Sequence, residues 1–508
     1  MQRKALKAAA VLAVASSLIG GSAVAAHSDQ EHGERNNAEI RNVIYLLGDG
    51  MGRTHVTAGR ERFYGAAGKL TMERLPFVGQ VSTYAVEKGS NKPALVTDSA
   101  SSSTAWSSGV KTYNAALGVD SYEKKVVTLM EQAKAAGLAT GNVSTAEITD
   151  ATPAGMFSHA LLRGCQGPTY SDAACLPKNA DGSYEAKPAD ATLITPIAEQ
   201  IARNGTADVI LGGGLARFEP DDQKALEAQG YQVLGSFGDP ALSAQTAASQ
   251  KVATKAELDA ANGKKVVGLF NRGNLTVEAA KSALPAGAAE KAEPTLSDMT
   301  GKALDLLAKK NKKGFFLQVE GAQIDKRSHA NDADQTLGEI KAFDDAVAKA
   351  VEFAKKDGHT LVIVTADHEC AGFNIIEKGS FTNAEAAAPP ANADAGNTAN
   401  NSSPARSSSA NVKDPSRSTG IVNGAGSKDP KNFAPATFRT PDDPAGVTDG
   451  SPEASLWLTY LSGNHTGADV PIFAYGPGGQ RFAASQDNTE LYGKMYSALF
   501  GGKPHGRD

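Results

Sequence analysis

The sequence predicts an α/β fold with a large central, mostly parallel β-sheet flanked by helices. Two observations predict it: short β-branched apolar runs recur along the chain, and alanine-rich segments of helical period separate them. With 508 residues, 41% of them hydrophobic, the chain can form a large core. The clearest helices are expected at 126–136, ending at Gly137, and at 337–356, ending near Gly358. The expected strands cover residues 43–47, 138–143, 208–211, 266–270, 315–319 and 361–364.

The N-terminus is organised as a secretory signal peptide. Basic residues precede an apolar run over 8–19, and small residues lead to a predicted cleavage site after Ala25 or Ala26. The alternative, a retained membrane anchor, needs roughly 20 apolar residues, and this run is shorter. The mature protein is therefore expected to be exported, periplasmic or secreted, and to have no membrane segment. The expected leader, flexible segment and single catalytic domain cover residues 1–25, 26–41 and 42–508.

The charge balance argues against a general nucleic-acid binder. Removal of the leader takes away three positive charges and no negative ones, which moves the formal net charge from −5 to −8. A mildly acidic chain lacks the excess of cations that binding to a phosphate backbone requires. Nucleic acid is therefore not expected as a specific partner.

Three cysteines occur in the chain, at positions 165, 175 and 370. In an oxidising compartment, Cys165 and Cys175 can close a short loop as a disulfide. Cys370 is then left without a partner. The alternative is that all three are buried, unreactive thiols.

One segment, from about 383 to 452, breaks the α/β pattern. It is rich in Ala, Asn, Ser, Pro, Gly and Asp and contains few apolar residues, so it cannot form a core of its own. We expect a long, low-complexity surface insertion that is partly flexible. The alternative is a lid or an oligomer contact near the active site, because long loops are often functional.

Polar residues follow three of the expected strands, and ligands of open α/β sheets bind beyond the carboxyl ends of strands. Carboxylate and imidazole groups are suitable zinc ligands, and two of these residues, four positions apart, would share one helical face. Taken singly, the groups also fit a turn, a solvated helix face or a hydrogen-bonded core pair. Three groups at three strand ends favour a metal site. The residues are Asp49, then Glu320, Asp325, Lys326 and His329, and then Asp367, His368 and Glu369.

Ser99 lies where a loop is expected to pass into a helix rich in small residues. There, backbone N–H groups and the helix dipole favour a bound phosphate. The alternative is that Ser99 is only an N-cap serine. No histidine is close in sequence to act as a general base, but a bound metal ion could activate the hydroxyl.

Four motifs together resemble the alkaline phosphatases, most closely the bacterial branch, in order as well as in spacing. The likeness extends from about Asn42 to the C-terminal region and leaves out the long insertion. The motifs are Leu47-Gly48-Asp49-Gly50-Met51-Gly52, Thr97-Asp98-Ser99-Ala100, Thr365-Ala366-Asp367-His368 and His465-Thr466-Gly467.

The resemblance implies hydrolysis of small phosphate monoesters with two zinc ions and one magnesium ion. Ser99 would attack phosphorus and form a phosphoserine, which a zinc-bound hydroxide would then hydrolyse. The first zinc would bind Asp325, His329 and His465, and the second Asp49, Asp367 and His368. Two metal ions roughly 4 Å apart can hold both the entering and the leaving oxygen.

The same resemblance implies a magnesium site and two cationic groups near the phosphate. Magnesium would bind the oxygens of Asp49, Thr152 and Glu320, with Asp150 close by through water. Arg163 would hold two phosphate oxygens, because its planar fork matches them. Lys326 would add positive charge through a water. The family also implies a homodimer.

The match has departures and rivals. Bacterial members often have a second disulfide, whereas Cys370 has no remaining partner here. A sulfatase is disfavoured because Ser99 is not in a Cys/Ser-x-Pro-x-Arg motif. A phosphodiesterase of the same superfamily and a non-catalytic exported phosphate- or metal-binding protein are the remaining alternatives. No role is assigned to His55, His159 and His359.

Overall fold

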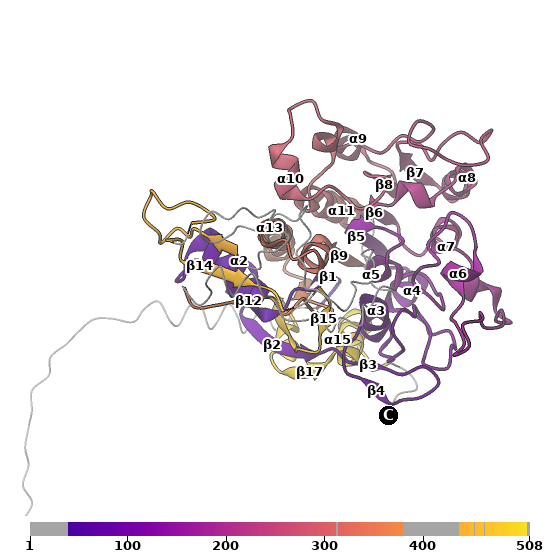
Figure 1. Ribbon diagram of the computed structural model, residues 1–508. Coiled ribbons are helices and arrows are strands. Elements are labelled where there is room, and N and C mark those ends of the chain that lie inside the picture. The colour runs from indigo at the N-terminus through magenta and orange to yellow at the C-terminus, as the bar shows by residue number, and fades with distance from the viewer. Residues whose placement is uncertain (1–38, 311–312, 379–435, 452, 462, 505–508) are drawn as a thin grey trace, which may run out of the picture.

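A ten-stranded sheet forms the centre of the computed structural model, which describes residues 39–310, 313–378, 436–451, 453–461 and 463–504 (Figure 1). The strand order is β17-β2-β16-β10-β1-β9-β5-β6-β8-β7. The pairs from β10 through β7 are parallel, whereas β16 is antiparallel to both of its neighbours. In chain order the ten are β1 (Asn42–Gly48), β2 (Phe77–Ser82), β5 (Ala139–Glu147), β6 (Val209–Gly213), β7 (Tyr231–Leu234), β8 (Lys265–Leu269), β9 (Phe315–Gly321), β10 (Thr360–Thr365), β16 (Val470–Tyr475) and β17 (Ser485–Asp487).

Helices cover both faces of this sheet, which confirms the predicted fold class. In Figure 1, α11 and α13 lie on one side of the central strands, and α3, α4 and α15 lie on the other. The main helices are α2 (Arg53–Tyr64), α3 (Ser99–Ser108), α4 (Leu129–Ala135), α7 (Ile197–Asn204), α8 (Pro220–Ala228), α11 (Leu296–Lys310), α12 (Gln323–His329), α13 (Ala333–Asp357) and α15 (Asn488–Phe500). Shorter helices are α5 (Ala151–Ala154), α6 (Asp172–Cys175), α9 (Lys255–Ala260) and α10 (Glu278–Ala283).

All six expected strands are present, but both expected helices begin elsewhere. The helix expected from residue 126 begins at Leu129, because Thr128 and Glu131 form a reciprocal capping box there. The helix expected from residue 337 begins four residues earlier, because the Asp332 carboxylate accepts the backbone N–H of Gln335. Side-chain caps therefore decide both starts.

Small sheets complete the fold at the edges of the large one. A three-stranded sheet, in the order β12-β14-β13, includes the C-terminal part of the predicted insertion, and Phe438 within it is buried. Residues 436–438 of the predicted insertion therefore form a strand of this sheet. Residues 383–435 of the insertion lie outside the described residues, as does the predicted leader. The small strands are β3 (Ala85–Val86), β4 (Pro93–Ala94), β11 (Glu369–Cys370), β12 (Asn374–Ile375), β13 (Ala436–Phe438), β14 (Leu456–Thr459) and β15 (His465–Thr466).

Buried polar side chains attach α3 and α5 to the sheet. The Trp106 indole N–H on α3 donates to the Gln318 side-chain oxygen on β9, and the Gln318 amide in turn donates to the Thr152 carbonyl on α5. Asn142 on β5 donates to the Pro153 carbonyl. Because each of these groups is buried, leaving one unpaired costs about 1–3 kcal/mol. The network therefore fixes both helices against the strands.

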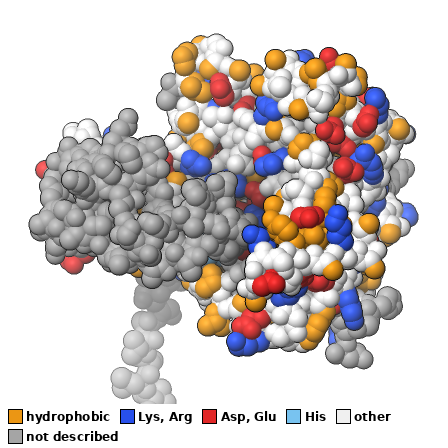
Figure 2. Space-filling view, turned by 45° about the vertical axis from the view of Figure 1, so that its right-hand side comes forward, with side chains coloured by type: hydrophobic (Ala, Val, Ile, Leu, Met, Phe, Trp, Pro, Cys, Tyr) orange, Lys and Arg blue, Asp and Glu red, His pale blue; other side chains and the backbone are white. Residues whose placement is uncertain are grey.

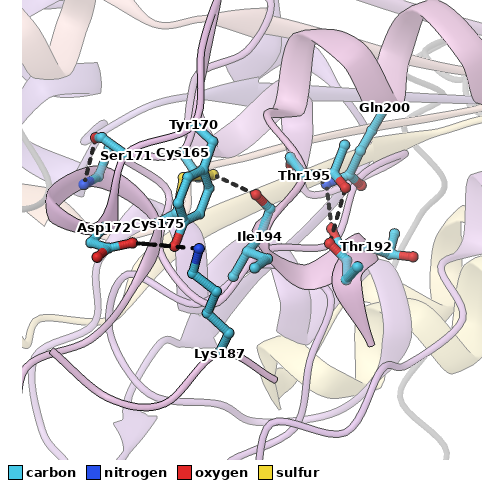
Figure 3. The surroundings of a disulfide bond; sticks show 12 residues. Cys165, Tyr170, Ser171, Asp172, Cys175, Lys187, Thr192, Ile194, Thr195 and Gln200 are labelled. Carbon is cyan, nitrogen blue, oxygen red and sulfur yellow. Dashed lines mark hydrogen bonds and ion pairs between the residues drawn. A yellow bond between two sulfur atoms is a disulfide. The ribbon is translucent and has the colours of Figure 1, made fainter. Parts of the chain in front are cut away.

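Cys165 and Cys175 form the predicted disulfide, which confirms that expectation (Figure 3). Cys370 is a buried free thiol. Among the described helices, none combines the length and the apolar character that a bilayer span requires. The face shown in Figure 2 carries acidic and basic side chains interspersed.

Candidate active site

Three adjacent parallel strands end at the same edge of the sheet and carry the expected polar residues. Leu47 on β1 is paired with Glu320 on the neighbouring strand β9 and with Thr365 on the other neighbour, β10. Asp49 and Asp367 each follow two residues later, so the three carboxylates meet at this edge. The Gly50 N–H donates to Asp367 Oδ1 at 2.9 Å, which joins the two loops.

The first group consists of Asp325 and His329 on α12 and His465 on β15. Asp325 Oδ2 lies 3.2 Å from His329 Nε2, and Asp325 Oδ1 lies 3.6 Å from His465 Nε2. The two Nε2 atoms are 3.1 Å apart. The Cys370 sulfur belongs to the same cluster, in which all ligand atoms lie within 4.8 Å of one another. Asp325 and His329 share one helical face, as predicted.

Backbone carbonyls fix how both imidazoles are oriented. His329 Nδ1 lies 2.6 Å from the Gly463 carbonyl, and His465 Nδ1 lies 3.0 Å from the Thr97 carbonyl. Because a carbonyl only accepts, the Nδ1 of each ring carries a proton, and the neutral tautomer of each ring would present an unprotonated Nε2 to the other. Two facing nitrogen lone pairs beside a carboxylate are favourable around a cation.

The second group brings Asp49, Asp367 and His368 to the Ser99 hydroxyl. Ser99 Oγ lies 3.1 Å from His368 Nε2 and 3.5 Å from Asp49 Oδ1. His368 Nε2 is 3.0 Å from Asp367 Oδ2. All four side chains are buried. Residues separated by more than 300 positions therefore meet around one serine, as the sequence predicts.

Ser99 is the first residue of α3 and does not cap it. Asp98 is the N-cap, and its carboxylate accepts the Ser101 N–H at 2.8 Å. The capping role considered for Ser99 is therefore filled by its neighbour, and the Ser99 hydroxyl faces the imidazole instead. At this position the helix dipole favours an anion.

The third group contains Asp150, Thr152, Arg163, Glu320 and Lys326. Asp150 lies between two cations: it accepts from Arg163 Nη2 at 2.7 Å and from Lys326 Nζ at 2.7 Å. Glu320 accepts a hydrogen bond from the Ser144 hydroxyl. The disulfide begins two residues after Arg163 and restrains the chain there. Electrostatic interactions with Asp49 join Glu320, Lys326 and Arg163 to the second group, and Thr152 lies on α5 two residues after Asp150.

Burial and like charge make this region electrostatically unfavourable without cations. Burial, aided by Asp367 and Asp325, raises the pKa of Asp49 well above its usual value. Burial also raises the pKa of Glu320 to about 8. Burial lowers the pKa of His465 well below its usual value, and the nearby His368 lowers it further. The acids therefore tend to keep their protons, and the imidazole stays neutral.

Elsewhere in the site, direct partners outweigh burial. Burial raises the pKa of Asp325, but His329 and His465 bring the net pKa well below its usual value. Burial likewise opposes charge on Asp150, yet Lys326 and Arg163 lower its pKa overall. Because Asp150 is ionised, it holds both cations in place.

Buried oxygens without hydrogen bonds show where cations fit. Within the described part of the chain, Asp325 Oδ1, Asp367 Oδ2 and Thr152 Oγ1 make no hydrogen bond, although each is buried. Buried polar atoms are otherwise nearly always satisfied. The first two groups offer nitrogen and oxygen ligands, with the Cys370 sulfur beside the first, whereas the possible ligand atoms of the third group are all oxygens. The residues therefore fit bound metal ions.

Sequence reasoning missed two residues of this region. Asp98 lies 3.4 Å from Arg163 Nη1, and an acid directly before Ser99 was an available signal. Ser144 contacts Glu320 from the neighbouring strand β5, and nothing local distinguishes it from other serines. Asp98 thus helps to position Arg163, and Ser144 helps to position Glu320.

Candidate metal ligands at one edge of a mostly parallel sheet, facing a serine at a helix start, fit the class of metal-dependent hydrolases. A family model described as alkaline phosphatase matches residues 40–500, which is most of the chain. The chain belongs to the alkaline phosphatase family, and it is an enzyme that hydrolyses phosphate monoesters. The predicted family and enzyme class are therefore confirmed.

Individual relatives agree with this assignment. The alkaline phosphatase of Escherichia fergusonii is 37% identical over 494 residues, which cover 91% of this chain and 87% of that protein. The streptomycin-6-phosphate phosphatase of Streptomyces griseus is 34% identical over 488 residues, which cover 91% of each. The cold-active alkaline phosphatase structure from a Shewanella species has a TM-score of 0.60 at 25% identity and covers 90% of this chain and 99% of that one.

Substitution of Gly50 by alanine should reduce bound metal. Gly50 has a φ of +68°, and an added Cβ would lie 2.8 Å from both Asp325 Oδ1 and the Cys370 Cβ. The methyl group would push a ligand out of place, and we expect about tenfold weaker binding of a divalent metal. Gly89→Ala is the matched control, because Gly89 has a φ of +69° and nothing within 4 Å. Equal metal content in the two variants would contradict this placement.

Metal binding should release protons near neutral pH. Glu320, with its pKa near 8, retains its proton at pH 7 in the metal-free protein, and a cation displaces that proton. Apparent metal affinity should therefore rise as the pH increases through about 8. Calorimetry in buffers of different ionisation enthalpy measures the release. Heats that do not depend on the buffer would refute it.

Proposed function

We propose that the protein hydrolyses small phosphate monoesters through a phosphoserine intermediate on Ser99, with two zinc ions and one magnesium ion. The observation that carries this proposal is the Ser99 hydroxyl, 3.1 Å from His368 Nε2 and facing Asp49, at the start of a buried helix. A serine hydroxyl is a weak nucleophile unless a base or a metal activates it. The carboxylates and imidazoles around Ser99 could hold the metal ion that activates its hydroxyl.

The donor chemistry supports a specific metal for each group. Mixed carboxylate and imidazole ligands suit zinc, and oxygen-only sites suit magnesium. When bound, zinc would lower the pKa of coordinated oxygens and stabilise charge on the entering and leaving groups. The proposed ligands are Asp325, His329 and His465 for the first zinc, Asp49, Asp367 and His368 for the second, and Asp49, Thr152, Glu320 and nearby Asp150 for magnesium.

The reaction proceeds in two displacements at phosphorus. The Ser99 oxygen attacks, the bond from phosphorus to the ester oxygen breaks, and the alcohol leaves after taking up a proton. Water then attacks the phosphoserine, the bond to Ser99 Oγ breaks, and the serine hydroxyl regains its proton. Each cycle consumes one water and releases one inorganic phosphate.

Arg163 is the proposed phosphate clamp. Its guanidinium is held from two sides, by Asp150 at 2.7 Å and by Asp98 at 3.4 Å, so its planar fork is oriented before substrate arrives. Lys326 is held by the other oxygen of Asp150 and contributes positive charge near the phosphate. Asp150 thus positions both cations.

The remaining expectations concern the environment of the protein. We propose that residues 1–25 direct export, that the mature protein acts in the periplasm or outside the cell, and that residues 42–508 form one catalytic domain. The mildly acidic formal net charge of the chain, −5, supports the absence of a specific nucleic-acid partner. We further propose a homodimer.

Ser99→Ala should abolish most turnover while metal remains bound. Loss of the nucleophile should lower kcat by roughly 1000-fold or more, because no other hydroxyl occupies its place. The assay is hydrolysis of a chromogenic phosphate monoester, together with measurement of bound zinc and magnesium. Ser107→Ala is the control, because Ser107 is buried on the same helix and its hydroxyl donates only to the Thr104 carbonyl. Full activity of Ser99→Ala would refute the phosphoserine route, and activity unaffected by chelation would refute the metal scheme.

A further inference from the structure

His55 is a fully buried histidine that the proposed chemistry does not use. It lies on α2, six residues after Asp49, and its ring packs against Phe373 with centroids 4.6 Å apart. Its side chain connects the loop after β1 with helix α12. These are the two segments that carry Asp49 on one side and Asp325 with His329 on the other.

The hydrogen bonds of His55 define the position of its proton. The Gly52 backbone N–H donates to His55 Nδ1 at 3.2 Å, so Nδ1 is the acceptor nitrogen. The proton of the neutral ring is therefore on Nε2, which lies 3.0 Å from the Ser328 hydroxyl. Burial lowers the pKa of His55 to about 3, so the ring is neutral at ordinary pH.

Ser328 passes this contact on to the helix backbone. Its hydroxyl accepts from His55 and donates to the Ile324 carbonyl at 2.8 Å. Ser328 directly precedes His329, and Ile324 directly precedes Asp325. The chain of hydrogen bonds therefore fixes the helical turn that presents both ligands.

Helix α12 needs support from outside, because it has only seven residues and no side-chain N-cap. Helices this short are marginal in water by themselves. Two other contacts hold α12. The Lys326 ammonium donates to the Asp150 carboxylate, and the Cys370 thiol lies 3.7 Å from the Asp325 carbonyl. The His55 contact comes from the first turn of α2, directly after the loop that carries Asp49.

We propose that His55 is a positioning residue: through Ser328 it sets the placement of Asp325 and His329 relative to Asp49, and so the spacing of the two zinc sites. This inference rests on the proposed two-zinc function. Two ions must stay roughly 4 Å apart to hold the entering and leaving oxygens of one displacement. A rigid connection between the two ligand segments supplies that constraint.

The test measures zinc affinity in the metal-free, full-length protein by direct titration, and the absorption spectrum after cobalt substitution. His55→Leu removes both hydrogen bonds and should weaken binding of the more loosely held zinc by about 10- to 100-fold, as loss of an outer-shell partner does. Ser328→Ala should act similarly. The double variant should lose no more than the stronger single variant, because both break one chain.

Conservative and matched variants separate positioning from general stability. His55→Gln can place an amide N–H near Ser328 and should restore most of the affinity. His159→Leu is the control, since His159 is also buried and bonded through both nitrogens, to Gly118 and Glu131. It should lower the melting temperature and leave zinc affinity and the cobalt spectrum unchanged.

The outcomes distinguish this inference from the proposed function. If the unaltered protein binds no zinc, the proposed function fails. If it binds zinc and the His55 and Ser328 variants bind equally tightly, or if their effects simply add, only the positioning role fails. Should His55→Leu not fold, Ser328→Ala and His55→Gln decide the question, because they change fewer atoms.

Discussion

The need to compensate buried negative charge dominates this site. Asp49, Asp325, Asp367 and Glu320 are buried together, and burial, followed by repulsion from neighbouring carboxylates, raises the pKa of Asp49 and of Glu320. Such a group is stable either with protons or with cations. The Nε2 atoms of His329 and His465, 3.1 Å apart, face the same space beside Asp325. Bound metal ions satisfy both kinds of ligand at once.

The parallel sheet makes this concentration of charge possible. Adjacent strands β1, β9 and β10 end together, so ligands distant in sequence meet without any long connection. Around them, uncharged or paired groups fix geometry: carbonyls orient the imidazoles, and Asp150 orients Arg163 and Lys326. The geometry of the site thus depends on backbone and side-chain groups that contact its ligands and its cationic residues.

The sequence was sufficient to predict the polar residues at the strand ends, but it did not predict the side-chain contacts that hold these residues. Asp49, Glu320 and Asp367 could be found because each directly follows an apolar run, and such runs are local patterns. Helix starts at Leu129 and Ala333 were misplaced because side-chain caps override periodicity. Contacts such as Ser144 with Glu320 join residues 176 positions apart and leave no local trace. The strand β13, within a stretch of low complexity, was missed because burial of Phe438 depends on β14, which comes later in the chain.

Anomalous scattering at the zinc edge from crystals of the zinc-loaded protein tests the central claim most directly. The claim is that these carboxylates and imidazoles hold two zinc ions beside Ser99. The account predicts two peaks roughly 4 Å apart, one among Asp325, His329 and His465 and the other among Asp49, Asp367 and His368. A single peak, or peaks away from the Ser99 hydroxyl, would contradict it.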